Sequence, residues 1–222
     1  PGQSKFKVRV VYRGDCVKDE WGDAAIFKDI TQCPATLEAA KVADCISCLP
    51  GCKGEQSDAT QAFPQAGFRG TETWIELPRS RCPDAWFKGK PAGYRPVCRM
   101  ARALYGHPES GGYWEQHCEE HLVSCGFVVI PQWPSTFWHP KWKLFLVVYV
   151  DDFKMAGRVE SMALAWSRLA EGLTMDPPTK LGLFLGAEHE PFSVRHPKKP
   201  GVQLHGMSYN VMGKLQSCVQ RY

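Results

Sequence analysis

The hydrophobic pattern of the chain is strongest between Leu144 and Gly157, where the sequence is LFLVVYVDDFKMAG. Residues 144–150 form an unbroken apolar run that is too short to span a bilayer and is typical of a strand buried on both faces. Two adjacent carboxylates, Asp151 and Asp152, interrupt the run before a second short apolar piece. This pattern predicts a hairpin that carries two acids at its turn.

The two neighbouring acids need a special geometry if they act together. Successive side chains of a strand point to opposite faces, so Asp151 and Asp152 approach one site only at a tight bend. Paired acids at the edge of a buried sheet are costly unless a cation neutralises them. From this stretch alone, an acidic turn that faces solvent remains the alternative interpretation.

The rest of the chain mixes helical and extended patterns. Apolar residues at helical spacing predict helices over residues 35–49, over the stretch marked by Trp114, Cys118, Leu122 and Cys125, and from Met162 to Leu173. Gly126 is expected to cap the second helix. Strands are predicted over residues 5–13, 71–77 and 181–190, residues 79–96 are predicted to form a loop, and the last twenty residues carry only a weak pattern. Strands mixed with helices, without a strict βαβ repeat, predict an α+β fold.

Composition limits the class of protein. The chain has 222 residues, enough for one large domain or two small ones, and its net charge of +4 is compatible with nucleic acid without requiring it. No signal peptide and no membrane-spanning run is recognisable in the sequence. We therefore expect an intracellular protein without membrane association. Because the sequence opens with Pro1 rather than Met, we also expect a piece of a longer protein.

The ten cysteines offer a possible metal site. Cys45, Cys48 and Cys52 have C-x2-C-x3-C spacing, but a zinc site requires a fourth ligand, and the sequence offers no clean second pair. Cys118 and Cys125 lie inside a helical pattern, as buried reduced thiols do. Core cysteines are the favoured interpretation, and a zinc-binding module is the alternative.

A third acid, Asp58, lies in the segment QSDATQAF at residues 56–63. Two acids on one hairpin and one on a separate segment predict a metal-binding trio. Phosphoryl transfer uses such a trio, because two Mg²⁺ ions about 4 Å apart activate the attacking oxygen and stabilise the leaving oxygen. Mg²⁺ prefers a few carboxylates together with substrate phosphate oxygens.

Six blocks of the chain, in order, resemble the reverse transcriptase of copia-type LTR retrotransposons. They correspond to the family's fingers strand, first catalytic-acid motif, following strand, template-and-nucleotide loop with its helix, YxDD box and LGxFLG block. The matching stretches are KVRVVYRG (7–14), QSDATQAF (56–63), TETWIELP (71–78), ALYGHPESGGYW (103–114), VVYVDDFKMAG (147–157) and LGLFLGAEHE (181–190). The blocks cover nearly the whole chain.

The resemblance implies a right-hand polymerase fold with fingers, a palm and a partial thumb. One reverse transcriptase domain would span residues 1–222, with an antiparallel palm sheet and packed helices. The fingers would comprise about 1–55 and 64–105, the palm about 56–63 and 106–190, and the partial thumb about 191–222.

The resemblance also implies the chemistry, an RNA-directed DNA polymerase that transfers a nucleotide from a dNTP to a primer 3′-hydroxyl. Asp58, Asp151 and Asp152 would be the catalytic carboxylates. Asp58 and Asp151 would hold two Mg²⁺ ions, for which Mn²⁺ can substitute, and the carbonyl of Ala59 would add a ligand. Asp152 would assist less directly.

The substrate-binding residues implied by the resemblance are Lys7, Arg9, Phe63, Glu109 and Tyr149. Lys7 and Arg9 would clamp the incoming triphosphate and offset the charge that develops on its oxygens. Phe63 would lie beneath the sugar of the nucleotide. Tyr149 belongs to the YxDD box, and Glu109 lies in the loop that faces the triphosphate.

The expected partners are an RNA or DNA template with its primer and a dNTP, with RNase H and integrase regions in a complete Pol polyprotein. The expected location is a cytoplasmic virus-like particle or the nucleus.

The loop at residues 107–112 departs from the family pattern, which reads Tyr-Gly-Leu-Lys-Gln, a small residue, Pro and Arg. Glu109 replaces a neutral amide and Gly112 replaces the Arg, so both changes lower the positive potential beside the expected triphosphate. The second function class is therefore a catalytically impaired or domesticated fragment that binds nucleic acid or a partner without polymerising.

Overall fold

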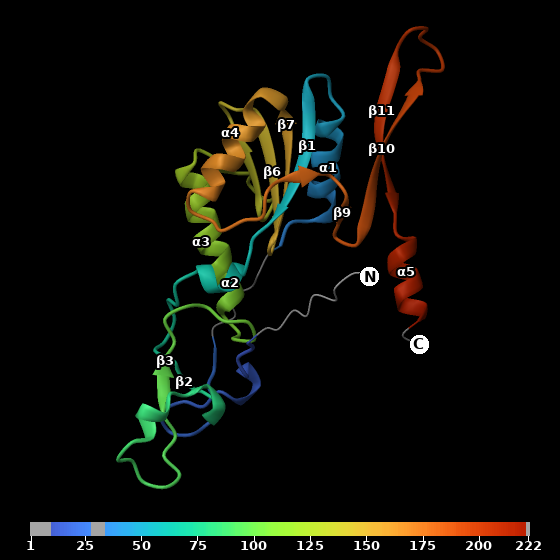
Figure 1. The fold of residues 1–222 in the computed structure, drawn as a ribbon. Coiled ribbons are helices and arrows are strands. Elements are labelled where there is room, and N and C mark those ends of the chain that lie inside the picture. Colours follow the sequence, from blue (N-terminus) through green and yellow to red (C-terminus); the bar gives the residue numbers. More distant parts are fainter. Residues whose placement is uncertain (1–9, 28–33, 221–222) are drawn as a thin grey trace. The chain divides into compact units, whose positions relative to one another are not determined.

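The computed structural model describes residues 10–27 and 34–220, which form helices and antiparallel sheets, as the α+β prediction requires (Figure 1). The chain divides into two compact units. The sheet unit comprises residues 32–62 and 115–222, and the small unit comprises residues 1–31 and 63–114. Each unit is described below by itself.

The sheet unit is built on a six-stranded antiparallel sheet in the order β4-β5-β6-β7-β1-β8. Its strands are β1 (Cys52–Asp58), β4 (Val128–Val129), β5 (Thr136–His139), β6 (Leu144–Tyr149), β7 (Asp152–Arg158) and β8 (Thr179–Lys180). Strands β6 and β7 form the predicted hairpin, and residues 144–148 are all buried. The prediction of an acid-bearing hairpin whose first strand is buried on both faces is therefore confirmed.

Helices cover both faces of this sheet (Figure 1). On one face lies α1 (Leu37–Ser47), which begins where the Thr36 hydroxyl accepts a hydrogen bond from the Ala39 N–H at 3.2 Å. The small side chains of Ala39 and Ala43 let α1 pack closely on β6 and β7. There they form one buried core cluster with Phe145, Val147 and Ala156.

The opposite face is covered by α4 (Val159–Ala170) and by the part of α3 (Ser110–Ser124) that belongs to the sheet unit (Figure 1). The predicted apolar stripe of α4 is confirmed, since Met162, Trp166 and Leu169 are buried. Gly126 ends α3 with a φ of +96°, a conformation that favours glycine, which confirms the predicted cap.

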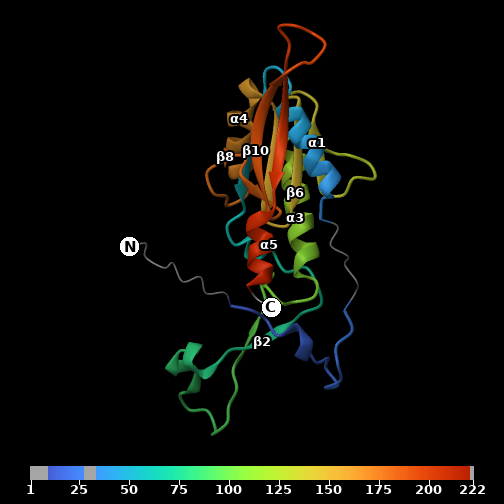
Figure 2. The same cartoon turned by 90° about the vertical axis from the view of Figure 1, so that its right-hand side faces the viewer.

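The C-terminal part of the sheet unit differs from its prediction. Residues 181–190 do not form one strand, because positive φ angles at Leu185 and Gly186 reverse the chain between β9 (Leu183–Phe184) and β10 (Ala187–Arg195). Strand β11 (Gln203–Asn210) pairs with β10 along its length, and α5 (Met212–Val219) follows (Figure 2). The weak sequence pattern of this region arises because most of the hairpin is exposed.

The small unit carries little regular structure. It contains the paired strands β2 (Trp74–Glu76) and β3 (Val97–Arg99), the short helix α2 (Ala62–Gln65) that begins at the boundary, and the 3-10 turns η1 (Gly14–Cys16), η2 (Arg79–Arg81) and η3 (Asp84–Phe87). The predicted strand over 71–77 is therefore present but shorter. For the strand predicted over 5–13, residues 5–9 lie outside the described part of the chain, and residues 10–13 are not a strand.

The units do not follow the predicted boundaries of fingers and palm. Helix α1 and most of β1, which the resemblance assigned to the fingers, belong to the sheet unit because the apolar face of α1 packs on β6 and β7. The division into fingers, palm and thumb stays a prediction. In residues 10–27 and 34–220, no helix combines the length and the apolar character that crossing a membrane requires.

Candidate active site

Two of the three candidate acids face each other across neighbouring strands. Asp58 ends β1 and Asp152 begins β7, and the two are directly paired in the antiparallel register. Tyr149, the last residue of β6, is the register partner of Asp152 on the other side. Because paired residues share a face of the sheet, Tyr149, Asp152 and Asp58 form one row across three strands.

The third acid lies in the turn that joins β6 to β7. This turn has two residues, Val150 and Asp151, and Val150 has a φ of +57°, which is unusual for a β-branched side chain. A positive φ at the first turn position matches a type II′ turn, whose twist suits a tight hairpin. The main-chain carbonyl of Asp151 accepts a hydrogen bond from the Ala59 N–H at 2.7 Å, which ties the turn to the end of β1. The predicted tight bend is confirmed.

A segment that the sequence did not indicate completes the frame around Asp58. The Asp176 N–H donates to the Asp58 carbonyl at 2.9 Å, and the Ser57 hydroxyl donates to the Asp176 carbonyl at 2.6 Å. The Thr60 hydroxyl donates to the Asp176 carboxylate at 3.3 Å. The backbone that presents Asp58 is therefore fixed by the β6–β7 turn and by residues near Asp176. Nothing in the sequence around Asp176, which precedes two prolines, indicates that it holds the backbone of Asp58.

The electrostatics of the cluster favour the binding of positive charge. Burial raises the pKa of Asp152 to about 6, and the neighbouring carboxylates of Asp58 and Asp151 and a hydrogen bond with Asp58 add to the increase. The charged form of Asp152 is therefore relieved either by a proton or by a nearby cation.

The acid cluster offers carboxylate oxygens, the ligands that Mg²⁺ prefers. Within the described ranges there is no group of three or more His, Cys, Asp or Glu side chains that could jointly hold a metal ion. Mg²⁺ is usually held by one or two carboxylates together with substrate phosphates and water, so two of the clustered acids Asp58, Asp151 and Asp152 are a sufficient protein contribution. The donor chemistry of these carboxylates fits a divalent cation.

The remaining predicted site residues lie in different parts of the chain. Ala59 is buried directly after Asp58, at the hydrogen bond to Asp151. Phe63 and Glu109 belong to the small unit, whereas Lys7 and Arg9 lie outside the described residues.

Phe63 and Glu109 each have a partner within the small unit. The half-buried ring of Phe63 stacks on Tyr105 with ring centroids 4.7 Å apart. Glu109 is buried and accepts a hydrogen bond from the Tyr113 hydroxyl. Burial and Glu109 together raise the pKa of Tyr113 above its ordinary value. The carboxylate that replaces a neutral amide of the family pattern therefore has a hydrogen-bond partner in its own unit.

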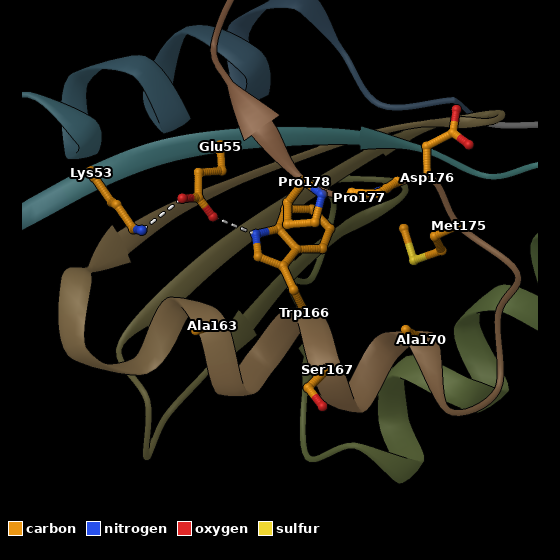
Figure 3. A pocket seen from close by; sticks show the side chains of 10 residues that line it. All are labelled: Lys53, Glu55, Ala163, Trp166, Ser167, Ala170, Met175, Asp176, Pro177 and Pro178. Atoms are coloured by element: carbon orange, nitrogen blue, oxygen red, sulfur yellow. Dashed lines mark hydrogen bonds and ion pairs between the residues drawn. The ribbon is translucent and has the colours of Figure 1, made fainter.

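A pocket of about 400 Å³ lies on the other face of β1 (Figure 3). Trp166 rises from α4 towards β1 and donates from its indole nitrogen to Glu55 at 2.8 Å, and Lys53 pairs with the same carboxylate at 2.6 Å. Because strand side chains alternate, Lys53 and Glu55 point away from the face that carries Asp58. The pocket therefore lies on the opposite face of β1 from the acids, although Asp176, whose N–H bonds the Asp58 carbonyl, also lines it.

The cysteines do not form a metal site in the described residues. Cys118 is buried, as predicted for a core thiol, but Cys45 is exposed and Cys48 and Cys52 are only partly buried. The core interpretation is therefore wrong for Cys45, because its side of α1 faces solvent.

Sequence reasoning also missed a buried charge next to the acid row. Lys154 of β7 has no exposed side-chain surface and pairs with Asp44 of α1, with 2.5 Å between Nζ and Oδ1. A lysine within an otherwise apolar buried strand was the available signal, because a buried charge requires a partner.

Comparison with known proteins identified no relative of this chain. No protein-family model matches the chain, and no curated protein matches it.

Proposed function

We propose that the chain is an RNA-directed DNA polymerase of a copia-type retrotransposon, in which Asp58, Asp151 and Asp152 form the catalytic carboxylates. The observation that carries this proposal is the meeting of Asp58 with Asp152 and the Asp151 turn, although the two segments are far apart in sequence. Carboxylates from separate segments that meet at one place are what a two-metal nucleotidyl transferase requires.

Each residue has a defined task in this proposal. Asp58 and Asp151 hold the cations, which supply activation of the primer 3′-hydroxyl and stabilisation of the leaving oxygen when bound. Asp152 lies beside Asp58 as its register partner and assists less directly, and Ala59 ties the turn to the end of β1 through its N–H. Lys7 and Arg9 bind the triphosphate oxygens, Glu109 and Tyr149 line the nucleotide site, and Phe63 contacts the sugar.

Primer extension on an RNA template, with Mg²⁺ and then with Mn²⁺, tests this function directly. Extension that depends on the divalent cation and stops when EDTA removes it would support the polymerase. Tight binding of primer–template without extension would instead favour the impaired or domesticated fragment, for which the departures at Glu109 and Gly112 are the motive. The two function classes therefore differ in the outcome of one experiment.

We expect the affinity for primer–template to fall steeply with salt, because phosphate contacts release counterions. The exposed basic residues at the tip of the β10–β11 hairpin, Arg195, Lys198 and Lys199, are the described candidates. Replacing all three with Gln should reduce the slope of log K against log salt by roughly two to three, at about 0.7–0.9 per lost contact.

The matched control for this measurement replaces Lys141 and Lys143 with Gln. These exposed residues precede β6, at the end of the strand opposite the acid turn. The control should leave the slope unchanged. Binding that ignores ionic strength in the unsubstituted protein would contradict the expectation.

Replacing Phe63 with Ala should raise the incorporation of ribonucleotides relative to deoxyribonucleotides. A packed ring beneath the sugar excludes a 2′-hydroxyl at a strain of about 1–3 kcal/mol, which corresponds to roughly ten- to a hundredfold discrimination. The measurement is kcat/KM for both nucleotides in the two proteins. Phe63→Tyr keeps the ring and should keep the ratio, and an unchanged ratio in an active Phe63→Ala variant would show that Phe63 is not the gate.

A further inference from the structure

The row of side chains directly behind the acid row carries a buried ion pair. Lys154 lies two residues after Asp152 in β7, and its register partner Gln56 lies two residues before Asp58 in β1. Because side chains two apart on a strand share a face, Lys154 and Gln56 lie on the same face as the acids. Lys154 is fully buried there against Asp44 of α1.

Besides the Ala40 carbonyl of α1, 3.4 Å from the Lys154 Nζ, the side-chain partners of this ion pair come from β9 and the C-terminal hairpin. His189 of β10 lies with its Nε2 3.1 Å from the Lys154 Nζ and 3.4 Å from the Asp44 Oδ2. Tyr209 of β11 donates from its hydroxyl to the Asp44 Oδ2 at 2.9 Å, and the ring of Phe184 lies 4.8 Å from the Lys154 Nζ. Asp44, Lys154, His189 and Tyr209 are called the hairpin anchor below.

The orientation of His189 is fixed by its other nitrogen. Its Nδ1 lies 2.9 Å from two main-chain carbonyl oxygens, of Gly182 and Ala187, and can only donate to them. Nδ1 therefore carries a proton, and Nε2 faces both the Lys154 ammonium and the Asp44 carboxylate. His189 thus joins the ion pair to the backbone of the segment that leads into the hairpin.

The hairpin has few other attachments to the six-stranded sheet. Among the nine residues of β10 only His189 is buried, and none of the residues of β11 is buried. His189 and Tyr209 are register partners, so one cross-strand pair makes both contacts. Gln56 adds a second link nearby, because its side chain bonds the Gly182 N–H at 2.9 Å and the Leu183 carbonyl at 3.0 Å.

We propose that Asp44 and Lys154 are positioning residues, which attach the β10–β11 hairpin to the catalytic strand β7 and thereby hold Asp152 in place for nucleotidyl transfer. The attachment stands on the contacts above, and the effect on transfer rests on the function proposed in the preceding section. Neither residue touches substrate in this proposal. They would act on Asp152 through the backbone of β7, in which Lys154 lies two residues after Asp152.

Two variants of different severity test the attachment without any assay of activity. Tyr209→Phe removes a single hydroxyl from the anchor, and Asp44→Leu with Lys154→Met replaces the whole ion pair by apolar side chains. Amide hydrogen exchange within residues 187–195 and 203–210 should accelerate roughly tenfold in the first variant and more in the second. Ser193→Ala is the matched control, because the Ser193 hydroxyl bonds His205 at 2.7 Å in the exposed part of the hairpin.

The positioning role is tested by steady-state extension with the double variant, Asp44→Leu and Lys154→Met. Displaced carboxylates should lower kcat at least tenfold while KM for the dNTP changes less than threefold, a split that loss of folded protein alone would not produce at a fixed active-site concentration. Accelerated exchange with this split supports the proposal. Unchanged exchange overturns the attachment, and accelerated exchange with unchanged kcat overturns the positioning. If the unsubstituted protein extends no primer, the polymerase proposal and the positioning role fall together, and the exchange experiment still decides the attachment.

Discussion

Replacing Asp151 with Asn is expected to reduce primer extension by roughly a thousandfold or more. The substitution removes one anionic ligand without changing the size of the side chain, and a lost metal interaction costs about 4 kcal/mol of transition-state stabilisation. The hydrogen bond from Ala59 to the turn involves the main-chain carbonyl of residue 151, so the hairpin should keep its shape. The measurement is single-turnover extension at saturating dNTP, with circular dichroism to establish that the variant is folded.

The matched control is Asp84→Asn, the same chemical change at an exposed position of the small unit. Its extension rate should stay within about twofold of the unsubstituted protein, as surface substitutions usually do. Extension by Asp151→Asn at the unsubstituted rate would show that the activity does not depend on the acid cluster. That result would remove the basis for assigning catalysis to Asp58 and Asp152 as well.

Replacing Lys154 alone with Met is expected to lower the free energy of unfolding of the sheet unit by about 3–5 kcal/mol. The loss arises because Asp44, whose side chain is 1% exposed, would remain buried without its cation. Burial opposes the charged form of Asp44, but hydrogen bonds with His189 and Lys154 outweigh it and hold the pKa of Asp44 below its ordinary value. Asp44 also lies in the last turn of α1, where the helix dipole disfavours a negative charge.

The double variant Asp44→Leu with Lys154→Met separates the cost of an unpaired buried charge from the net contribution of the ion pair to stability. Replacing a buried ion pair by apolar side chains is often nearly neutral, so most of the lost stability of the six-stranded sheet should return. The hairpin should still be released, because His189 and Tyr209 lose their partners. Urea unfolding of the two single variants, the double variant and the unsubstituted protein gives the coupling energy of the pair. Arg168→Met, which removes an exposed ion pair with Glu171, should cost less than about 1 kcal/mol. A loss of that small size for Lys154→Met would show that Asp44 is hydrated after the substitution.

The acid cluster could be predicted because its signals are local and strong. Seven consecutive apolar residues before Asp151 indicate a buried strand, and two adjacent acids after it require a turn. The position of Asp58 beside them follows from the resemblance rather than from any pattern, since its pairing with Asp152 joins distant segments. The α+β fold could be predicted for the same reason, because each strongly periodic segment indicates a helix or a strand without reference to the rest of the chain.

The C-terminal sheet could not be predicted because its stability comes from a few specific contacts. Residues such as Phe192, Val194 and Leu204 are exposed in the hairpin, so alternation of apolar and polar side chains does not mark a buried face. Of the turn residues Leu185 and Gly186, only Gly186 favours a positive φ, and a single glycine within an apolar run is a weak turn signal. Lys154 lies inside an apolar piece, and its partner Asp44 lies on a distant helix, so no local pattern links the two.

The place of β1 in the sheet sets the order in which the protein can be assembled on the ribosome. Strand β1 lies between β7 and β8, both of which are synthesised much later. A nascent chain that has not yet released residue 158 therefore holds Asp58 on a strand with both edges unpaired, which is the state most prone to wrong pairing with other chains. The charged and amide side chains of CKGEQSD make this unpaired strand polar. The same residues that will surround the acids are thus suited to protect the unfinished chain from aggregation.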